Sequence, residues 1–139
     1  MQAACLNFQF DNYEQVITRR REIAAQYQEL LKDVAQVDLP PGPSMNSDHY
    51  DVYQNYEIEA QQRDKLKAFL TDNGIGTLIQ WGGKAVHQFT TLGFDQVLPF
   101  TEEVFTRLLM LPLNMSITDT EVNYVAEKII TFYRNNEKI

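Results

Sequence analysis

The fold of this chain is decided around one stretch, Asn73-Gly74-Ile75-Gly76-Thr77-Leu78-Ile79-Gln80-Trp81-Gly82-Gly83-Lys84-Ala85-Val86-His87-Gln88-Phe89. It begins with Asn-Gly, which is typical of the end of a helix because glycine accepts the left-handed conformation that follows the last turn. Residues 75–81 form a short apolar run that predicts a strand. The two adjacent glycines that follow predict a loop whose backbone can come close to a ligand. We interpret the other segments as helices and strands that hold this loop in place.

A β-α-β unit is predicted to lead into this stretch. Residues 50–60 alternate in polarity, which predicts a half-buried strand. Residues 63–73 predict a helix whose C′ position is Gly74. With the strand at 75–81, two strands then flank one helix. The apolar positions that we expect to be buried in the first strand and in the helix are Val52, Tyr56, Ile58, Leu66, Phe69 and Leu70.

Two helices are predicted ahead of this unit. Residues 2–10 have apolar side chains on several sides, which suits burial against a neighbour. Residues 11–34 have the strongest helical periodicity in the chain, and Asp11 with Glu14 resembles a capping box at its start. The prolines of residues 39–43 then predict an exposed connector. The apolar positions that we expect to be buried in the second helix are Tyr13, Val16, Ile17, Ile23, Ala24, Tyr27, Leu30, Leu31 and Val34.

Two more helices are predicted in the C-terminal part. Pro99 suits the first turn of a helix that ends near Leu109. Thr118 and Glu121 form a capping box for the last helix. Residues 110–113 lie between them and are at most an edge strand, because their proline cannot donate a ladder hydrogen bond. The residues expected on the buried faces are Phe100, Val104, Phe105 and Leu108 in the first helix and Val122, Val125, Ile129 and Phe132 in the second.

Together these elements predict an α+β fold, with a small sheet of two or three strands packed with helices and preceded by a long amphipathic helix. The 139 residues suit a single small domain, 1–139. Within it we expect lead-in helices over residues 1–36 and a sheet-and-helix unit over residues 50–134.

Composition narrows the function classes. A hydrophobic content of 44% and a charged content of 22% are typical of a soluble globular protein. The net charge of −7 argues against nucleic acid as a partner, which would need a basic face. The run Arg19-Arg20-Arg21 does not change this, because consecutive helical residues point about 100° apart and form no single phosphate-binding stripe.

The chain also lacks sequence signals for export or membrane insertion. No run approaches the roughly 18 apolar residues that a membrane span needs, and no signal peptide is recognisable. The single cysteine, Cys5, excludes an intramolecular disulfide. We therefore expect no membrane partner and a cytoplasmic location.

The loop that follows the predicted strand holds the candidate binding residues. Two glycines allow close backbone approach, a lysine can pair with phosphate, and a histidine can bond a sugar oxygen or a phosphate. The spacing is not that of a P-loop, and no histidine and cysteine pattern predicts a metal site. A tight turn with a solvated lysine explains Gly-Gly-Lys equally well. The candidate substrate-binding residues are Trp81, Gly82, Gly83, Lys84, His87 and Gln88, with no catalytic residue assigned.

The three tyrosines of the first predicted strand, Tyr50, Tyr53 and Tyr56, are interpreted as sheet surface rather than as a stacking platform.

Several runs of the chain, taken in order, resemble one enzyme family. They are Gln2-Ala3-Ala4, Arg19-Arg20-Arg21-Glu22-Ile23-Ala24 leading to Tyr27, Arg63-Asp64 leading to Asn73-Gly74-Ile75-Gly76-Thr77, Leu109-Met110-Leu111-Pro112-Leu113-Asn114, and Glu121-Val122-Asn123-Tyr124-Val125. Together they resemble the C-terminal third of the DegT/StrS-type nucleotide-sugar aminotransferases. These are pyridoxal-phosphate enzymes of the aspartate aminotransferase fold, fold type I, that move an amino group from glutamate to a nucleotide-linked keto-sugar.

The loop departs from the family pattern. Where most members have a Tyr-Pro-type segment and Pro-Leu-His, this chain has residues 81–89, and this variant resembles the branch that acts on dTDP-3-keto-6-deoxyhexoses. By the resemblance, His87 matches the family's substrate-contacting histidine. The family's Schiff-base lysine segment is absent, and Lys84 cannot replace it because it matches a substrate loop.

The resemblance implies a small domain that belongs to a larger enzyme. The complete enzyme would use pyridoxal phosphate, form a homodimer and bind a nucleotide-sugar substrate, with an N-terminal pyridoxal-phosphate domain supplying the chemistry. For this chain alone we expect no cofactor and no catalysis. The alternatives are a stand-alone binding or interaction module that has lost catalysis, and an enzyme without pyridoxal phosphate that uses His87 and Lys84.

Overall fold

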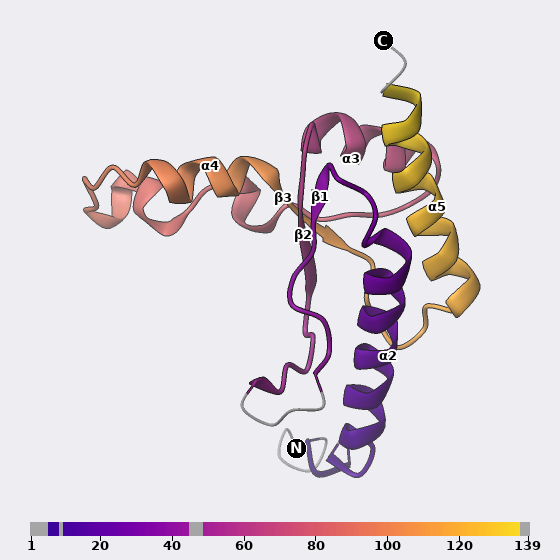
Figure 1. Cartoon of the computed structure of the whole chain (residues 1–139). Coiled ribbons are helices and arrows are strands. Elements are labelled where there is room, and N and C mark those ends of the chain that lie inside the picture. The colour runs from indigo at the N-terminus through magenta and orange to yellow at the C-terminus, as the bar shows by residue number, and fades with distance from the viewer. Residues whose placement is uncertain (1–5, 9, 45–48, 137–139) are drawn as a thin grey trace.

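The structure, a computed structural model, describes residues 6–8, 10–44 and 49–136. The elements are α2 (Tyr13–Leu31), β1 (Val37–Asp38), β2 (Tyr56–Ala60), α3 (Arg63–Asp72), the 3₁₀ turns η2 (Gln80–Gly83), η3 (Val86–Gln88) and η4 (Thr90–Leu92), α4 (Pro99–Arg107), β3 (Leu108–Leu111) and α5 (Asp119–Asn136), shown in Figure 1. This arrangement confirms the predicted α+β class. The predicted helix at 2–10 lies partly outside the described residues; positions 6–8 and 10 are helical and exposed.

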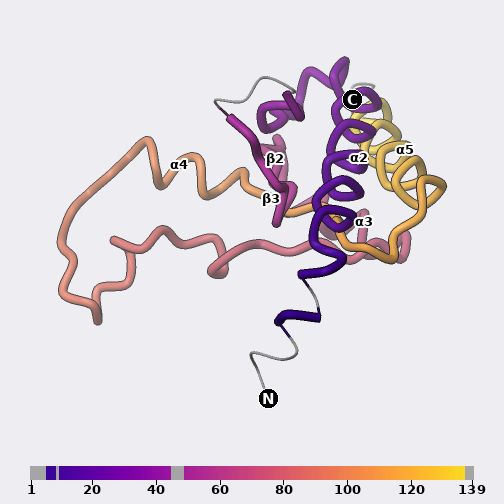
Figure 2. The backbone as a smooth tube through the Cα atoms, turned by 90° about the horizontal axis from the view of Figure 1, so that it is seen from below, coloured from indigo at the N-terminus to yellow at the C-terminus, as the bar shows by residue number. Residues whose placement is uncertain are grey.

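A three-stranded antiparallel sheet lies in the order β1-β2-β3. β2 pairs with β1 through Val37 and Ala60, and with β3 through Tyr56 and Leu111. β1 lies between the predicted helix at residues 11–34 and the predicted connector at residues 39–43, where no strand was expected. The helices α2 and α5 run side by side and pack with one face of the sheet (Figures 1 and 2). The strand residues buried in this core are Val37, Tyr56, Ile58, Ala60, Leu109 and Leu111.

Tyrosines contribute to the core. The burial of Tyr53 corrects its interpretation as sheet surface, whereas Tyr56 was expected on the buried face of its strand. Tyr53 and Tyr56 are buried, and only Tyr50 of that group is exposed. The ring of Tyr27 lies 5.1 Å from that of Tyr56, centroid to centroid, and its hydroxyl donates to the carbonyl of Pro112 at 2.9 Å. The positive φ of 48° at Tyr53 interrupts the extended chain, so β2 begins at Tyr56 instead of residue 50.

The arginine run of α2 fastens irregular segments to the helix. As expected from helical geometry, the three side chains diverge, and each donates to backbone carbonyls of another segment at 2.6–2.9 Å. The acceptors are Ile117 for Arg19, Tyr53 and Gln54 for Arg20, and Ser44 and Asp51 for Arg21. Arg21 is buried, with 9% of its surface exposed, and its guanidinium also lies over the ring of Tyr50.

Two of the predicted helix ends are confirmed. Gly74 has a φ of 76°, and its N–H and that of Ile75 bond back to Thr71 and Leu70, which is a Schellman motif. At the start of α5, the capping box is formed by reciprocal hydrogen bonds between Thr118 and Glu121.

The predicted cap of the long helix is wrong. α2 begins at Tyr13 after Asn12, with no side-chain capping bond, so Asp11 and Glu14 do not form the capping box that their spacing indicated.

The predicted strand at 75–81 is reduced to one bridge between Leu78 and Met110. The chain enters a 3₁₀ turn at Gln80, and positive φ values at Trp81 and Gly82 cannot continue a strand. β3, expected to be at most an edge strand, therefore lies between β2 and Leu78. The second strand of the predicted β-α-β unit is a single residue pair long.

Residues 80–107 leave the body of the molecule as a projection that we call the finger (Figures 1 and 2). α4 lies in the finger, and its first residue is the expected Pro99. The predicted buried face of this helix is wrong, because none of its residues is buried and Phe100 is 78% exposed. The reason is tertiary, since the outer part of α4 extends beyond the sheet and the other helices.

Within the described residues, no helix is long and apolar enough to cross a membrane.

Replacing Arg21 by lysine tests the fastening role of the arginine run. An ammonium group cannot donate to both carbonyls in the fork geometry of a guanidinium, so we expect the free energy of unfolding to fall by about 2 kcal/mol. Urea unfolding measures this change, and Arg134→Lys, at an exposed position of α5, is the matched control. Equal effects of the two substitutions would contradict the role.

The capping box of α5 predicts a pH dependence. The N–H and hydroxyl of Thr118 hold the pKa of Glu121 below its usual value. Stabilisation by this carboxylate is therefore present above the ordinary glutamate pKa of about 4.3 and is lost as the pH falls through the lowered pKa. The difference in Tm between wild type and Glu121→Ala should shrink as the pH falls below about 4. Glu121→Gln, which keeps an acceptor that does not titrate, is the control, and a difference that stays constant down to low pH would be evidence against the box.

Candidate functional site

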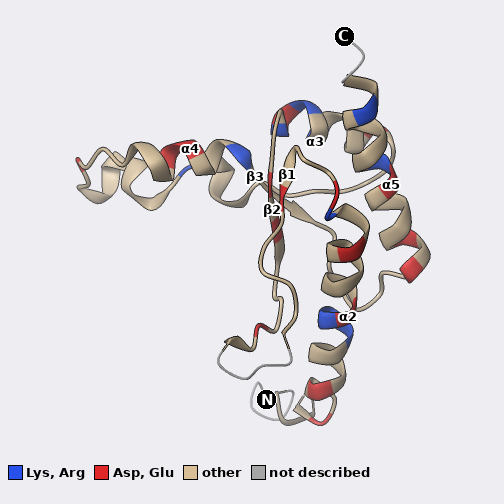
Figure 3. Ribbon diagram, viewed as in Figure 1, with Lys and Arg blue, Asp and Glu red and all other residues tan. Residues whose placement is uncertain are grey.

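The candidate loop and α4 enclose a pocket in the finger with a volume of about 650 Å³. We call it the finger pocket. Its lining residues are Trp81, Lys84, Ala85, Val86, His87, Phe89, Leu92, Leu98, Thr101 and Phe105. Most of these side chains are apolar. Between residues 85 and 101 the sequence has one charged residue, Asp95, and in Figure 3 the outer finger is almost free of charged ribbon.

The base of the finger is fixed by hydrogen bonds to the sheet and to α3. Leu78 and Met110 exchange two backbone hydrogen bonds, at 3.2 and 2.9 Å. A guanidinium nitrogen of Arg63 donates to the carbonyl of Phe105 at 3.0 Å, near the end of α4. A Cβ at Gly83, where φ is +76°, would lie 3.5 Å from the same nitrogen. Arg63 therefore lies next to the segment that leaves the body at Gly83 and also bonds the segment that returns at Phe105.

A salt bridge adds to this support. Arg107, the last residue of α4, donates two hydrogen bonds to the carboxylate of Glu59 on β2, at 2.9 and 3.2 Å. The side chains of both residues are 31% exposed. The two ends of the finger are thus held by neighbouring strands.

His87 is the most buried polar residue of the site, with 6% of its surface exposed. Its Nε2 lies 3.1 Å from Oε1 of Glu102 in α4. The same carboxylate oxygen accepts the N–H of Leu98 at 3.2 Å. The hydrogen bond from His87, and next that from Leu98, hold the pKa of Glu102 below its usual value. His87 therefore packs beneath the loop and also lines the finger pocket.

The structure brings part of the predicted set together. Trp81, Lys84 and His87 line the finger pocket, and Trp81 is 70% exposed. Gly82 and Gly83 form the turn beside it. The remaining predicted residue, Gln88, uses its side-chain oxygen to accept the N–H of Ala85 at 2.9 Å and so stabilises the loop itself.

The residues that α4 and the segment before it contribute to the finger pocket were not predicted from the sequence. Leu98, Thr101, Glu102 and Phe105 line or support the pocket. The sequence predicted this helix, but it placed Phe105 on a face buried in the core and not in a pocket. The only signal in the sequence was Glu102 in the first turn after Pro99. This signal was not specific, because acidic residues are common in the first turn of helices, where they interact favourably with the helix dipole.

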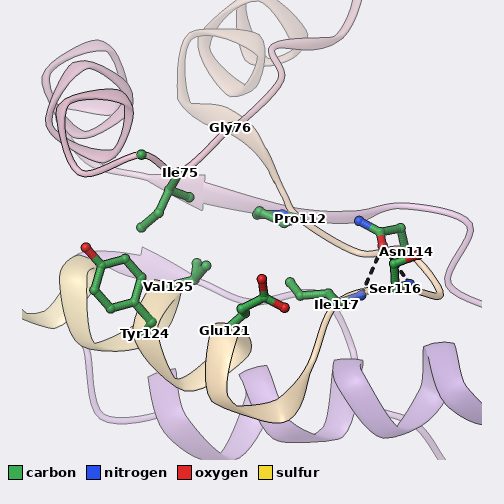
Figure 4. A pocket seen from close by; sticks show the side chains of 10 residues that line it. Ile75, Gly76, Pro112, Asn114, Ser116, Ile117, Glu121, Tyr124 and Val125 are labelled. Atoms are coloured by element: carbon green, nitrogen blue, oxygen red, sulfur yellow. Dashed lines mark hydrogen bonds between the residues drawn. The ribbon is translucent and has the colours of Figure 1, made fainter.

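A second pocket, of about 470 Å³, lies between the end of α3 and α5 (Figure 4). Several of its polar groups already have partners. The side-chain oxygen of Asn114 accepts the N–H groups of Ser116 and Ile117, and Glu121 belongs to the capping box. Among the residues that the structure describes, no group of histidine, cysteine or acidic side chains is placed to hold a metal ion. The finger pocket is therefore the better candidate for a binding site.

Comparison with known proteins identifies the family. The model of the DegT/DnrJ/EryC1/StrS aminotransferase family matches residues 1–130. A pleiotropic regulatory protein of Geobacillus stearothermophilus is 36% identical over 138 residues, which are 97% of this chain and 37% of that protein. A dTDP-4-dehydro-2,3,6-trideoxy-D-glucose 4-aminotransferase of Saccharopolyspora spinosa is 34% identical over 130 residues, covering 92% of this chain and 33% of that enzyme.

Solved structures agree with this match. The crystal structure of a DegT DnrJ EryC1 StrS aminotransferase from Brucella abortus superposes with a TM-score of 0.80 and 29% identity, over 94% of this chain and 35% of that one. DesV of S. venezuelae, in complex with a ketimine intermediate, superposes with a TM-score of 0.85 over 95% of this chain and 36% of its own; at 24% identity it supports the fold alone.

The chain spans about a third of the length of these relatives, and the part it matches is their C-terminal region. The predicted resemblance is thus confirmed: this chain belongs to the DegT/DnrJ/EryC1/StrS aminotransferase family.

Proposed function

We propose that this chain is the C-terminal part of a pyridoxal-phosphate-dependent sugar aminotransferase that moves an amino group from glutamate to a nucleotide-linked keto-deoxy sugar. The observation that carries the proposal is the family match over residues 1–130, together with the coverage of only a third of the relatives. Two relatives bear names of enzymes that act on dTDP-linked sugars, one a 4-aminotransferase and one, 26% identical, a dTDP-3-amino-3,6-dideoxy-alpha-D-galactopyranose transaminase. The second supports the 3-keto branch that the loop resembles.

The residues of the finger pocket do not fit pyridoxal phosphate. The cofactor needs a lysine for its aldimine, an acidic partner for its ring nitrogen and groups that hold its phosphate. Of the lining residues only Lys84 and His87 can carry charge, and no carboxylate lines the pocket. The cofactor would therefore be held by the N-terminal domain of the complete enzyme, and this chain alone would bind none.

The role of this chain would be to bind the sugar nucleotide. Trp81 offers a flat, exposed apolar face at the pocket, and Lys84 offers a positive charge for a phosphate. His87 offers hydrogen bonding to the sugar. Gly82 and Gly83 shape the turn, and Gln88 keeps the loop closed through Ala85.

The surface of the finger suits burial in a larger assembly. Its exposed apolar side chains are Trp81, Val86, Leu92, Phe94, Val97, Leu98 and Phe100. A patch of this kind is typical of an interface. We propose two partners, which are the N-terminal domain of the complete enzyme and a second copy of that enzyme in a homodimer. The proposed location of this assembly is the cytoplasm.

A second candidate is a stand-alone binding module that has lost catalysis. The observation in its favour is that a relative 36% identical to this chain is named a pleiotropic regulatory protein, a name that states no catalytic activity. The genomic sequence upstream separates the two. A reading frame of roughly 230 codons preceding Gln2 supports the aminotransferase, and a stop codon shortly upstream in the same frame supports the module.

Replacing His87 by alanine in the complete enzyme should slow the sugar half-reaction and leave the glutamate half-reaction unchanged. The loss of one hydrogen bond to the sugar would cost about 1–3 kcal/mol, or roughly ten- to a hundredfold in kcat/KM. Pre-steady-state rates of the two half-reactions measure this. His49→Ala, at an exposed position far along the chain from the loop, is the control. An equal loss in both half-reactions would mean that His87 only packs beneath the loop.

Borohydride reduction tests the proposed location of the cofactor. We expect this chain, mixed with pyridoxal phosphate and reduced, to show no single stoichiometric label on a lysine, because the pocket lacks the groups that would hold the ring and the phosphate. Peptide mapping of the reduced protein gives the result, and other lysines, such as the exposed Lys65, give the background level. One label per chain on Lys84 would contradict the proposal.

A further inference from the structure

The carboxylate of Glu102 joins two parts of the finger that lie apart in sequence. One oxygen lies 3.1 Å from Nε2 of His87 in η3 and 3.2 Å from the N–H of Leu98, which precedes α4. Glu102 itself is in the first turn of α4. The neighbouring acidic residue does not share this role, because Glu103 points to Arg107, at 2.5 Å. Glu102 is thus tied to the pocket and Glu103 to the base of the finger.

The hydrogen bond fixes which nitrogen of His87 carries the proton. The bonds from His87 and Leu98 lower the pKa of Glu102, so its side chain is an ionised carboxylate at neutral pH and can only accept. Nε2 must therefore donate. In a neutral imidazole the other nitrogen, Nδ1, is then an unprotonated acceptor. Within the part of the chain that the structure describes, no protein group bonds to Nδ1 of His87.

From this geometry we propose that Glu102 is a positioning residue, which holds the imidazole of His87 in the finger pocket with Nδ1 as an acceptor for a hydroxyl group of the bound sugar. This proposal rests on the proposed function. It sharpens the ligand chemistry, because an acceptor binds a hydroxyl and does not bind a keto oxygen or a phosphate. It also assigns a role to a residue that touches no substrate and acts through His87.

The first test needs no substrate. Heteronuclear NMR of the ¹⁵N-labelled 139-residue chain at neutral pH reports the protonation of both ring nitrogens, and the exposed His49 provides an internal reference. For His87 we expect an unprotonated Nδ1 and an Nε2 proton that is slow enough in exchange to be observed. In Glu102→Ala the Nε2 proton should exchange with water and disappear, and in Glu102→Gln it should return in part, because an amide oxygen still accepts.

Glu103→Ala is the matched control, since it removes the adjacent carboxylate and leaves the His87 contact intact. Amide spectra of each variant report whether it is folded, and Glu102→Gln decides the matter if Glu102→Ala does not fold. A protonated Nδ1 in the wild type, or an unchanged His87 spectrum in a folded Glu102 variant, would overturn the proposal.

The second test uses the complete enzyme and a double-mutant cycle. Glu102→Ala should slow the sugar half-reaction roughly tenfold, and it should cause no further loss when His87 is already alanine. Glu102→Gln should recover part of the rate. Additive losses of Glu102→Ala and His87→Ala would overturn the positioning role. If the NMR results hold and neither variant slows the sugar half-reaction, His87 does not bind the sugar and the positioning role is overturned. A complete enzyme without any sugar half-reaction would instead overturn the proposed function.

Discussion

The finger depends on the backbone of β3, which is paired on both sides. One side of the strand meets β2, in the register of Met110 with Glu57, and the other side exchanges two hydrogen bonds with Leu78. The chain leaves the body just after Leu78 and returns at the end of α4, just before β3 begins. Both ends of the finger therefore meet β3, and the salt bridge from Arg107 to Glu59 also ties the returning end to β2.

In the body of the molecule, side chains satisfy backbone carbonyls of irregular segments that have no partner in the sheet. A buried or half-buried carbonyl needs a donor, and the long segments around β1 and β2 have few ladder partners. The arginines of α2 supply these donors from a rigid helix, and Arg63 does the same for the end of α4. In the sequence these basic residues resemble a charged patch, but in the structure their guanidinium groups donate hydrogen bonds to backbone carbonyls of the same chain.

The finger differs from the body in what stabilises it. It contributes Ala85 and His87 as buried residues, and neither belongs to the hydrophobic core of the sheet and helices. Its shape comes from local hydrogen bonds, such as those of Glu102, and from apolar contacts around the pocket. Such a segment is typical of a binding element that a rigid scaffold presents and that a partner surface completes. The coverage of only a third of the family's chains fits this picture.

The sequence by itself determined the features that depend on neighbouring residues: the periodicity of α2 and α5, the glycine that ends α3, the capping box of α5 and the α+β class, together with the family resemblance. It also proposed a candidate site in the loop whose residues line the finger pocket in the structure. Only the tertiary structure decided that Arg21 is buried, that residues 75–81 form one bridge, that α4 lacks a buried face and that His87 pairs with Glu102. The physical reason is that caps and periodic faces involve residues within one or two turns, whereas these four outcomes depend on which segments meet in space, and local pattern carries no information about that.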